Sequence, residues 1–236
     1  MRSLVHFLPI VTTLVAIPFI VVLYRHWRRK PDSLYLLWWM IGVLTYAAGT
    51  TTESLTTLMG WDPVVFKAWY ISGALLGGAP LAQGSVYLLL PRRVAHRLTV
   101  ALSGFVIIAA IFVVLSPLDL ARVETFRLSG RVLQWQWVRL FSPFINTYAV
   151  IFLVGGAILS AWKYARVDKS YRGRMWGNVL IAVGAILPGI GGGSARAGRV
   201  EVLYVTELVG LVLIWWGYRT IMNDKSGTIH ANQKLS

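Results

Sequence analysis

Residues 98–115 read LTVALSGFVIIAAIFVVL, a run without a single charged side chain. A helix rises 1.5 Å per residue, so a run of this length approaches what is needed to cross the ~30 Å hydrocarbon core of a bilayer. The apolar residues do not alternate with polar ones, as they would in a strand of a membrane β-barrel. This stretch therefore predicts a membrane-spanning helix.

Six further runs of the same kind accompany it. The sequence predicts an all-α, polytopic integral membrane protein with seven transmembrane helices, over residues 4–24, 33–59, 64–90, 98–115, 138–162, 175–190 and 200–222. We expect one seven-helix membrane domain over residues 1–222, followed by a short cytoplasmic tail at 223–236.

The composition of the chain agrees with this reading. Its 236 residues are 56% hydrophobic with a mean hydropathy of +0.63. Only 14% are charged, against about 25% in an ordinary soluble domain. There is no cysteine, which excludes thiol chemistry and any Cys-ligated metal. A soluble enzyme, a disordered chain and a disulfide scaffold are therefore excluded.

The distribution of lysine and arginine predicts the orientation, because cytoplasmic loops of membrane proteins are enriched in both. Fifteen of the 23 fall in the connections after the first, third and fifth helices and in the tail. We expect that side to be cytoplasmic and the N-terminus to lie outside, in a cell's inner (plasma) membrane. The net charge of +14 then serves contact with anionic membrane lipids, and nucleic acid is not an expected partner.

Ionisable residues at membrane depth are costly and mark candidate functional positions. Glu53 and Glu207 both lie in the outer half of their helices, about 10 Å from the outer ends. Lys67 begins the third helix on the same side, and we expect it to pair with Glu53 across the turn at 60–63. The residue types predict an outward-facing polar pocket; the alternative is a structural ion pair that fixes the helices. The candidate ligand-binding residues are Glu53, Lys67, Trp69, Tyr70, Tyr204 and Glu207.

Three local patterns carry further expectations. The small-xxx-small motifs at 73–77 and 173–177 favour close helix packing inside the monomer over dimerisation. The run PGIGGGSARAG at 188–198 is expected to unwind the outer end of the sixth helix. The loop at 116–137 is either a short interfacial helix or an ordinary connection.

Catalytic patterns are scarce. The seventh helix holds no lysine for a retinal Schiff base, the four histidines are scattered, and no GxSxG or P-loop motif occurs. We name no catalytic and no metal-ligating residue, and an enzyme would have to use Glu53, Glu207 or Asp62 as acid or base. The cofactor is unknown: the many tryptophans fit an interfacial belt, although a pigment or quinone site could use the same rings.

The region of the second and third helices resembles the seven-helix N-terminal membrane region of some bacterial sensor histidine kinases. The similar residues are Tyr46 and Glu53 in a Trp-rich helix, the run KAWYISG at 67–73, then Pro80, Tyr87 and Arg92. The likeness covers about sixty residues. It implies a sensing role, with the signal passing to a membrane or cytoplasmic protein partner because the sequence contains no kinase.

The leading hypothesis is a non-enzymatic, sensor-like module that binds a small molecule or lipid in the outward-facing pocket. The first alternative is an accessory subunit of a larger membrane complex, which could be pigment- or quinone-associated. The second is a small secondary transporter, although Glu53 and Glu207 do not occupy matched places in two three-helix repeats.

Overall fold

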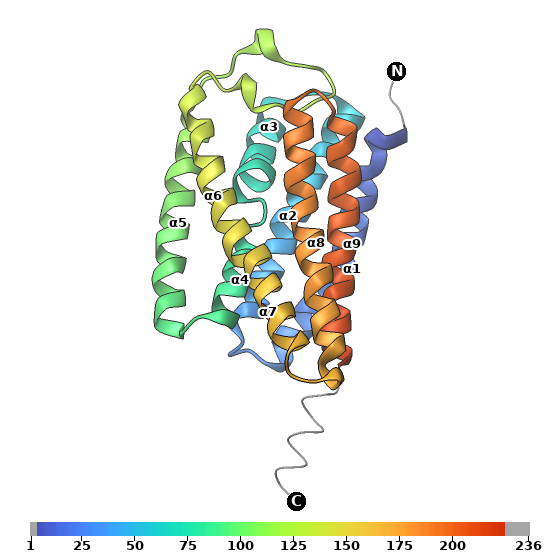
Figure 1. Cartoon of the computed structure of the whole chain (residues 1–236). Helices are drawn as coiled ribbons and strands as arrows, with labels where there is room; N and C mark the ends of the chain where they lie inside the picture. Colours follow the sequence, from blue (N-terminus) through green and yellow to red (C-terminus); the bar gives the residue numbers. More distant parts are fainter. Residues whose placement is uncertain (1–3, 225–236) are drawn as a thin grey trace, which may run out of the picture.

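A computed structural model describes residues 4–224 of the chain as an elongated bundle (Figure 1). Seven helical spans in this part of the chain are long and apolar enough to cross a membrane, which confirms the predicted all-α, seven-helix class. In chain order they are Leu4–Arg29 (η1, Leu4–Phe7; α1, Leu8–Arg29); α2, Leu34–Met59; Pro63–Leu89 (α3, Pro63–Trp69; η2, Tyr70–Leu76; α4, Ala79–Leu89); α5, Arg92–Leu115; Gln136–Ala165 (η5, Gln136–Leu140; α6, Phe141–Ala149; η6, Val150–Gly155; α7, Gly156–Ala165); Lys169–Arg196 (η7, Lys169–Tyr171; α8, Arg172–Arg196); and α9, Val200–Asn223.

The two ends of the bundle differ. The connection at 116–135, between α5 and η5, and the turn between α8 and α9 lie at the end drawn uppermost in Figure 1, here called the loop end. The α1–α2, α4–α5 and α7–α8 connections lie at the opposite end, here called the basic end, because these connections and the helix turns beside them carry most of the lysines and arginines of the described residues. Of the predicted tail at 223–236, all but Asn223 and Asp224 lies outside the described residues.

The most extensive helix contact joins α8 to α9 through glycines. A Cβ atom on Gly210 would lie 2.6 Å from the carbonyl oxygen of Gly184, and one on Gly217 would lie 2.5 Å from that of Gly177. No side chain fits in these positions, so the two backbones approach as small residues allow in membranes. The expectation that Gly177 serves packing inside one chain is confirmed.

Helix α8 continues through Pro188 to Arg196, so the expected unwinding from residue 188 is wrong. Proline has no N–H to offer to the carbonyl of residue 184, one turn earlier. That carbonyl instead lies against Gly210 of α9, and the Pro188 ring also packs there, 3.1 Å from the position of a Gly210 Cβ. The neighbouring helix α9 thus packs closely against the freed carbonyl.

The third and fifth spans are irregular in the middle. The π-helices η2 and η6 interrupt them, and such segments are rare and frequent at functional sites. Gly77 follows η2 with φ +43°, a left-handed conformation that favours glycine. A Cβ on Gly78 would lie 3.4 Å from the Cβ of Ala149, immediately before η6, so the two irregular regions are neighbours.

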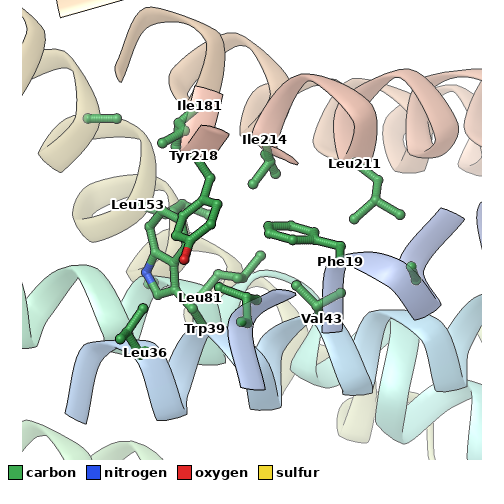
Figure 2. Packing of buried hydrophobic residues seen from close by; sticks show 14 of the residues in the cluster. Phe19, Leu36, Trp39, Val43, Leu81, Leu153, Ile181, Leu211, Ile214 and Tyr218 are labelled. Carbon is green, nitrogen blue, oxygen red and sulfur yellow. The ribbon is translucent and has the colours of Figure 1, made fainter. Parts of the chain in front are cut away.

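The largest buried cluster fills the centre of the bundle (Figure 2). Phe19 of α1 stacks on Trp215 of α9 with 5.6 Å between ring centroids, and Trp39 of α2 contacts Tyr218 at 6.0 Å. A Cβ on Gly84 would fall 1.9 Å from the Trp39 ring, so α4 needs glycine here. The cluster joins α1, α2, α4, α8 and α9 around one apolar centre.

The connection at 116–135 forms no interfacial helix of the predicted length. It contains two short 3₁₀ turns, η3 (Leu120–Arg122) and η4 (Gly130–Val132), which favours the alternative of an ordinary connection. Its buried apolar residues pack on Phe66, Tyr70 and Val113 in a second apolar cluster; they are Leu128, Val132 and Leu133. The connection therefore covers the loop end of α3 and α5.

Candidate functional site

Glu53 of α2 and Glu207 of α9 face one another inside the bundle. Their carboxyl groups lie within hydrogen-bonding contact of each other, although the two residues are far apart in sequence. Glu53 is only 4% exposed. Both residues lie in the half of the bundle nearer the loop end, as their sequence positions predict.

The two carboxyl groups have fewer hydrogen-bond donors than oxygen atoms. Trp69 donates its indole N–H to Glu53 Oε1 at 3.0 Å. The Oε2 atoms of Glu53 and Glu207 are buried, and neither receives a hydrogen bond from a described residue. No ion pair between a described cation and either carboxylate occurs. Buried polar atoms are nearly always satisfied, so this pair keeps acceptor capacity that the described residues leave unused.

Local structure explains why Trp69 reaches Glu53. Trp69 is the last residue of α3, immediately before η2. A Cβ on Gly49 would lie 3.2 Å from the Cα of Gly73, so α2 and η2 approach closely at this level. The Trp69 indole packs over Gly73, where a Cβ would lie 3.5 Å from Nε1. Two glycines therefore bring the indole N–H to the carboxylate.

Hydroxyl side chains near the pair are already engaged. Thr50, Thr52, Ser54 and Thr56 are buried along α2, and each hydroxyl donates to a carbonyl three or four residues earlier. These bonds keep the polar half of α2 compatible with an apolar environment. They also leave the carboxyl groups as the unsatisfied acceptors.

Aromatic and charged side chains surround the pair. The hydroxyl of Tyr46, two helical turns before Glu53, donates to the backbone carbonyl of Glu207 at 2.9 Å. Tyr204, one turn before Glu207, is 3% exposed and lies within electrostatic range of both glutamates. His6 contacts the Tyr204 ring edge-on, with centroids 6.1 Å apart, and its Nε2 lies 3.9 Å from Glu201 Oε1.

The connection at 116–135 reaches over this region. Arg127 donates from Nη2 to the carbonyl of Ala195 at 2.7 Å and pairs with Glu124 at 3.3 Å. The first contact ties the connection to the end of α8. Arg127 also lies within electrostatic range of Tyr204, so the connection borders the site at the loop end.

The expected pairing of Glu53 with Lys67 is wrong. Lys67 Nζ instead donates to the carbonyl oxygen of Val114 at 2.6 Å. Val114 lies in the last turn of α5, where carbonyl groups have no partner within their own helix. A cation is stabilised at a helix C-terminus, so Lys67 caps α5 rather than balancing Glu53.

Tyr70 and Asp62 also have other surroundings. Tyr70 packs in the cluster beneath the 116–135 connection, where a Cβ on Gly130 would lie 2.8 Å from its ring. Asp62 caps α3, because its Oδ1 accepts the N–H groups of Val64 and Val65 at 2.8 and 2.9 Å. Of the six candidates, the structure brings together Glu53, Trp69, Tyr204 and Glu207.

The sequence did not lead us to Tyr46 as a site residue. It also did not predict the polar network in the half of the bundle nearer the basic end. The signal for Tyr46 is its spacing of seven from Glu53, which places both on one face of α2. In the other half, Gln83 donates to Thr99 Oγ1 at 2.7 Å and accepts from the Tyr148 hydroxyl. Tyr87 links Thr99 to His96, with 2.9 Å to each. This network joins α4, α5 and α6.

Within residues 4–224 no group of three or more His, Cys, Asp or Glu side chains is arranged to hold a metal ion. Comparison with protein-family models, curated proteins and solved structures found no match.

Proposed function

We propose that this chain is a non-enzymatic, sensor-like membrane module that binds a small molecule through Glu53 and Glu207. The ligand carries an ammonium or hydroxyl group and enters from the loop end, which faces the outside of the cell. The observation that carries the proposal is the pair of facing carboxyl groups, whose buried Oε2 atoms receive no hydrogen bond from the described residues.

The chemistry of the pair favours this ligand class. Ammonium and hydroxyl groups donate hydrogen bonds, and an ammonium also offsets the charge of a buried carboxylate. Without a ligand, a proton shared by the two carboxyl groups would supply the missing donor. Two carboxylates alone do not provide the six to eight oxygen ligands that calcium prefers, so an organic group suits the site better.

A response to binding would pass through Trp69. Its indole holds one carboxylate, and it ends α3 immediately before the π-helix η2. A ligand bound at the Oε2 atoms draws the Glu53 carboxylate away from the Trp69 indole, which allows η2 to change its hydrogen-bonding register. The resemblance of this region to sensor kinases assigns the signal to a separate protein partner.

The orientation and location belong to the same proposal. Cytoplasmic connections are rich in lysine and arginine. At the basic end, four such cations lie in and beside the α1–α2 connection and five lie in and beside the α7–α8 connection. We therefore assign the basic end to the cytoplasm, with the N-terminus outside, in the plasma membrane.

The accessory-subunit alternative has one observation in its favour. Helix α5 lies at the edge of the bundle (Figure 1). Only 11% of the residues in its most apolar stretch are buried. Val100, Ile107, Ile108 and Ile111 are at least half exposed on it. Lipid or a partner subunit could cover this face. The transporter alternative gains no comparable support from the described residues.

Extraction from the native membrane in mild detergent separates the proposals. We would measure the particle mass and identify every co-purifying molecule by mass spectrometry. A small particle that retains one amine or hydroxyl compound supports the sensor-like module, and Glu53→Gln and Glu207→Gln should lower the retention about tenfold each. Asp32→Asn is the matched control, because Asp32 is an exposed acid in the α1–α2 connection, at the opposite end of the bundle. Stoichiometric foreign subunits would establish the accessory role instead.

A further inference from the structure

A groove lies on the outer surface of the bundle between α7 and α8, and none of its lining residues belongs to the glutamate site. Its volume is about 440 Å³. All its lining side chains are apolar: Ile158, Ala161, Trp162, Ala165, Met175, Val179, Ala182, Val183 and Ile186. Small alanines form part of its floor, and four of the larger side chains at its rim are exposed. The groove therefore faces the hydrocarbon region of the membrane.

A second hollow of about 470 Å³ lies next to the groove at the basic end. The two share the lining residues Ala165 and Met175, so they adjoin one another. The α7–α8 connection forms the second hollow and contributes the cations Arg166, Lys169 and Arg172, against a single acid, Asp168. The apolar groove thus ends at a cluster of positive charge.

The structure holds the first of these cations at the junction. The guanidinium of Arg166 lies over the Trp162 ring, 3.8 Å from its centroid. Such stacking fixes a cation that would otherwise be free to move. Because Trp162 also lines the groove, the apolar and charged parts of the surface meet at this pair.

The neighbouring Arg174 serves a structural purpose. Its guanidinium lies 5.7 and 5.5 Å from the Tyr164 and Tyr171 rings, which stack on one another. Its backbone N–H donates to Asp224 Oδ2 at 2.9 Å. Arg174 therefore braces the α7–α8 connection, while Arg166, Lys169 and Arg172 remain exposed around the hollow.

We propose that the α7–α8 groove is a binding site for an anionic phospholipid. An acyl chain lies along the apolar groove, and the phosphate contacts Arg166, Lys169 and Arg172. Basic pockets between helices at the cytoplasmic face bind anionic headgroups in this way. The adjacency of the apolar groove and the basic hollow selects a phospholipid over free phosphate, because free phosphate would leave the apolar part unused. The site is independent of the function proposed for Glu53 and Glu207.

The test uses the full chain and two probes with identical acyl chains, phosphatidylglycerol and phosphatidylcholine. Lipid retained by the purified protein is counted by native mass spectrometry during titration. The wild type should prefer phosphatidylglycerol about tenfold or more. The triple variant Arg166→Ala, Lys169→Ala, Arg172→Ala should lose that preference. Its matched control, Arg92→Ala, Arg93→Ala, Arg97→Ala, removes three cations from the first turns of α5 at the same end and should keep it.

A second variant tests the apolar half. Ala165→Leu adds volume where the two hollows meet, at an exposed position that tolerates a larger side chain. It should lower retention of both lipids. The proposal is overturned if both triple variants lose the preference equally, if Ala165→Leu retains both lipids as the wild type does, or if millimolar inorganic phosphate displaces the lipid.

Discussion

Glu53 on α2 and Glu207 on α9 place their carboxyl groups in contact inside the bundle, and no described cation pairs with either. Ionisable side chains at membrane depth are rare and costly, and those that persist usually serve a function. A pair of acids without a cation costs stability that the fold does not recover by itself. We therefore propose that the arrangement serves a ligand.

The protein should tolerate glutamine at position 53 better than alanine. In Glu53→Gln the new NH₂ group can donate to Glu207, so the thermal stability of the purified protein should equal or exceed that of the wild type. Glu53→Ala leaves a cavity and an unpartnered indole N–H, and should cost about 2 kcal/mol. Thermal unfolding followed by tryptophan fluorescence compares them. Equal losses in the two variants would show that the carboxylate itself stabilises the fold.

Trp69 should matter through its N–H group. Trp69→Phe keeps a ring over Gly73 but removes the donor to Glu53 Oε1, which is buried. We expect a loss of about 1–3 kcal/mol in unfolding free energy. Trp176→Phe is the control, because that side chain is 58% exposed on α8. If the two substitutions have the same effect, the hydrogen bond contributes nothing specific.

The glycine contact between α8 and α9 should be intolerant of a single methyl group. A Cβ on Gly184 would lie 2.6 Å from the carbonyl oxygen of Gly210, so Gly184→Ala should destabilise by about 1–3 kcal/mol. Gly189 lies on the same helix, and a Cβ there meets nothing within 4 Å. Gly189→Ala should be neutral or stabilising, since alanine favours helix. Chemical or thermal unfolding in detergent measures the stability of both variants. Equal stability would contradict the prediction.

The lack of cysteine makes the orientation directly measurable. Thr125 on the 116–135 connection and Ser170 on the α7–α8 connection are both exposed. In intact cells, a membrane-impermeant thiol reagent should label Thr125→Cys and spare Ser170→Cys until the membrane is permeabilised. The reverse pattern would place the glutamate pair nearer the cytoplasm and remove the basis for an outside ligand.

Hydropathy located all seven spans because length and apolar content are properties of each segment alone. The depth of Glu53 and Glu207 followed from the helical rise in the same way. Which residues meet depends on how each helix is rotated against its neighbours, and this depends on packing. Lys67 illustrates the limit: the carbonyl of Val114 that it binds lies 47 residues away on a helix whose position the sequence does not give.

Pro188 illustrates a second limit. Its effect on α8 depends on Gly210 of another helix, which packs closely against the carbonyl that proline leaves without a partner. The contact of Tyr46 with Glu207 is likewise set by the α2–α9 arrangement, although its spacing from Glu53 could have indicated a shared face. Local rules describe each helix, and the site arises where helices meet.

The central claim is that Glu53 and Glu207 form one negatively charged binding site open to the outside. It is tested most directly by the modification rate of Glu207→Cys with two methanethiosulfonate reagents of similar size, one carrying an ammonium group and one a sulfonate. Applied from outside, the ammonium reagent should react about tenfold faster, because Glu53 attracts it. Adding Glu53→Gln should abolish that difference. Equal rates for the two reagents in the single variant, or no reaction from outside, would contradict the account.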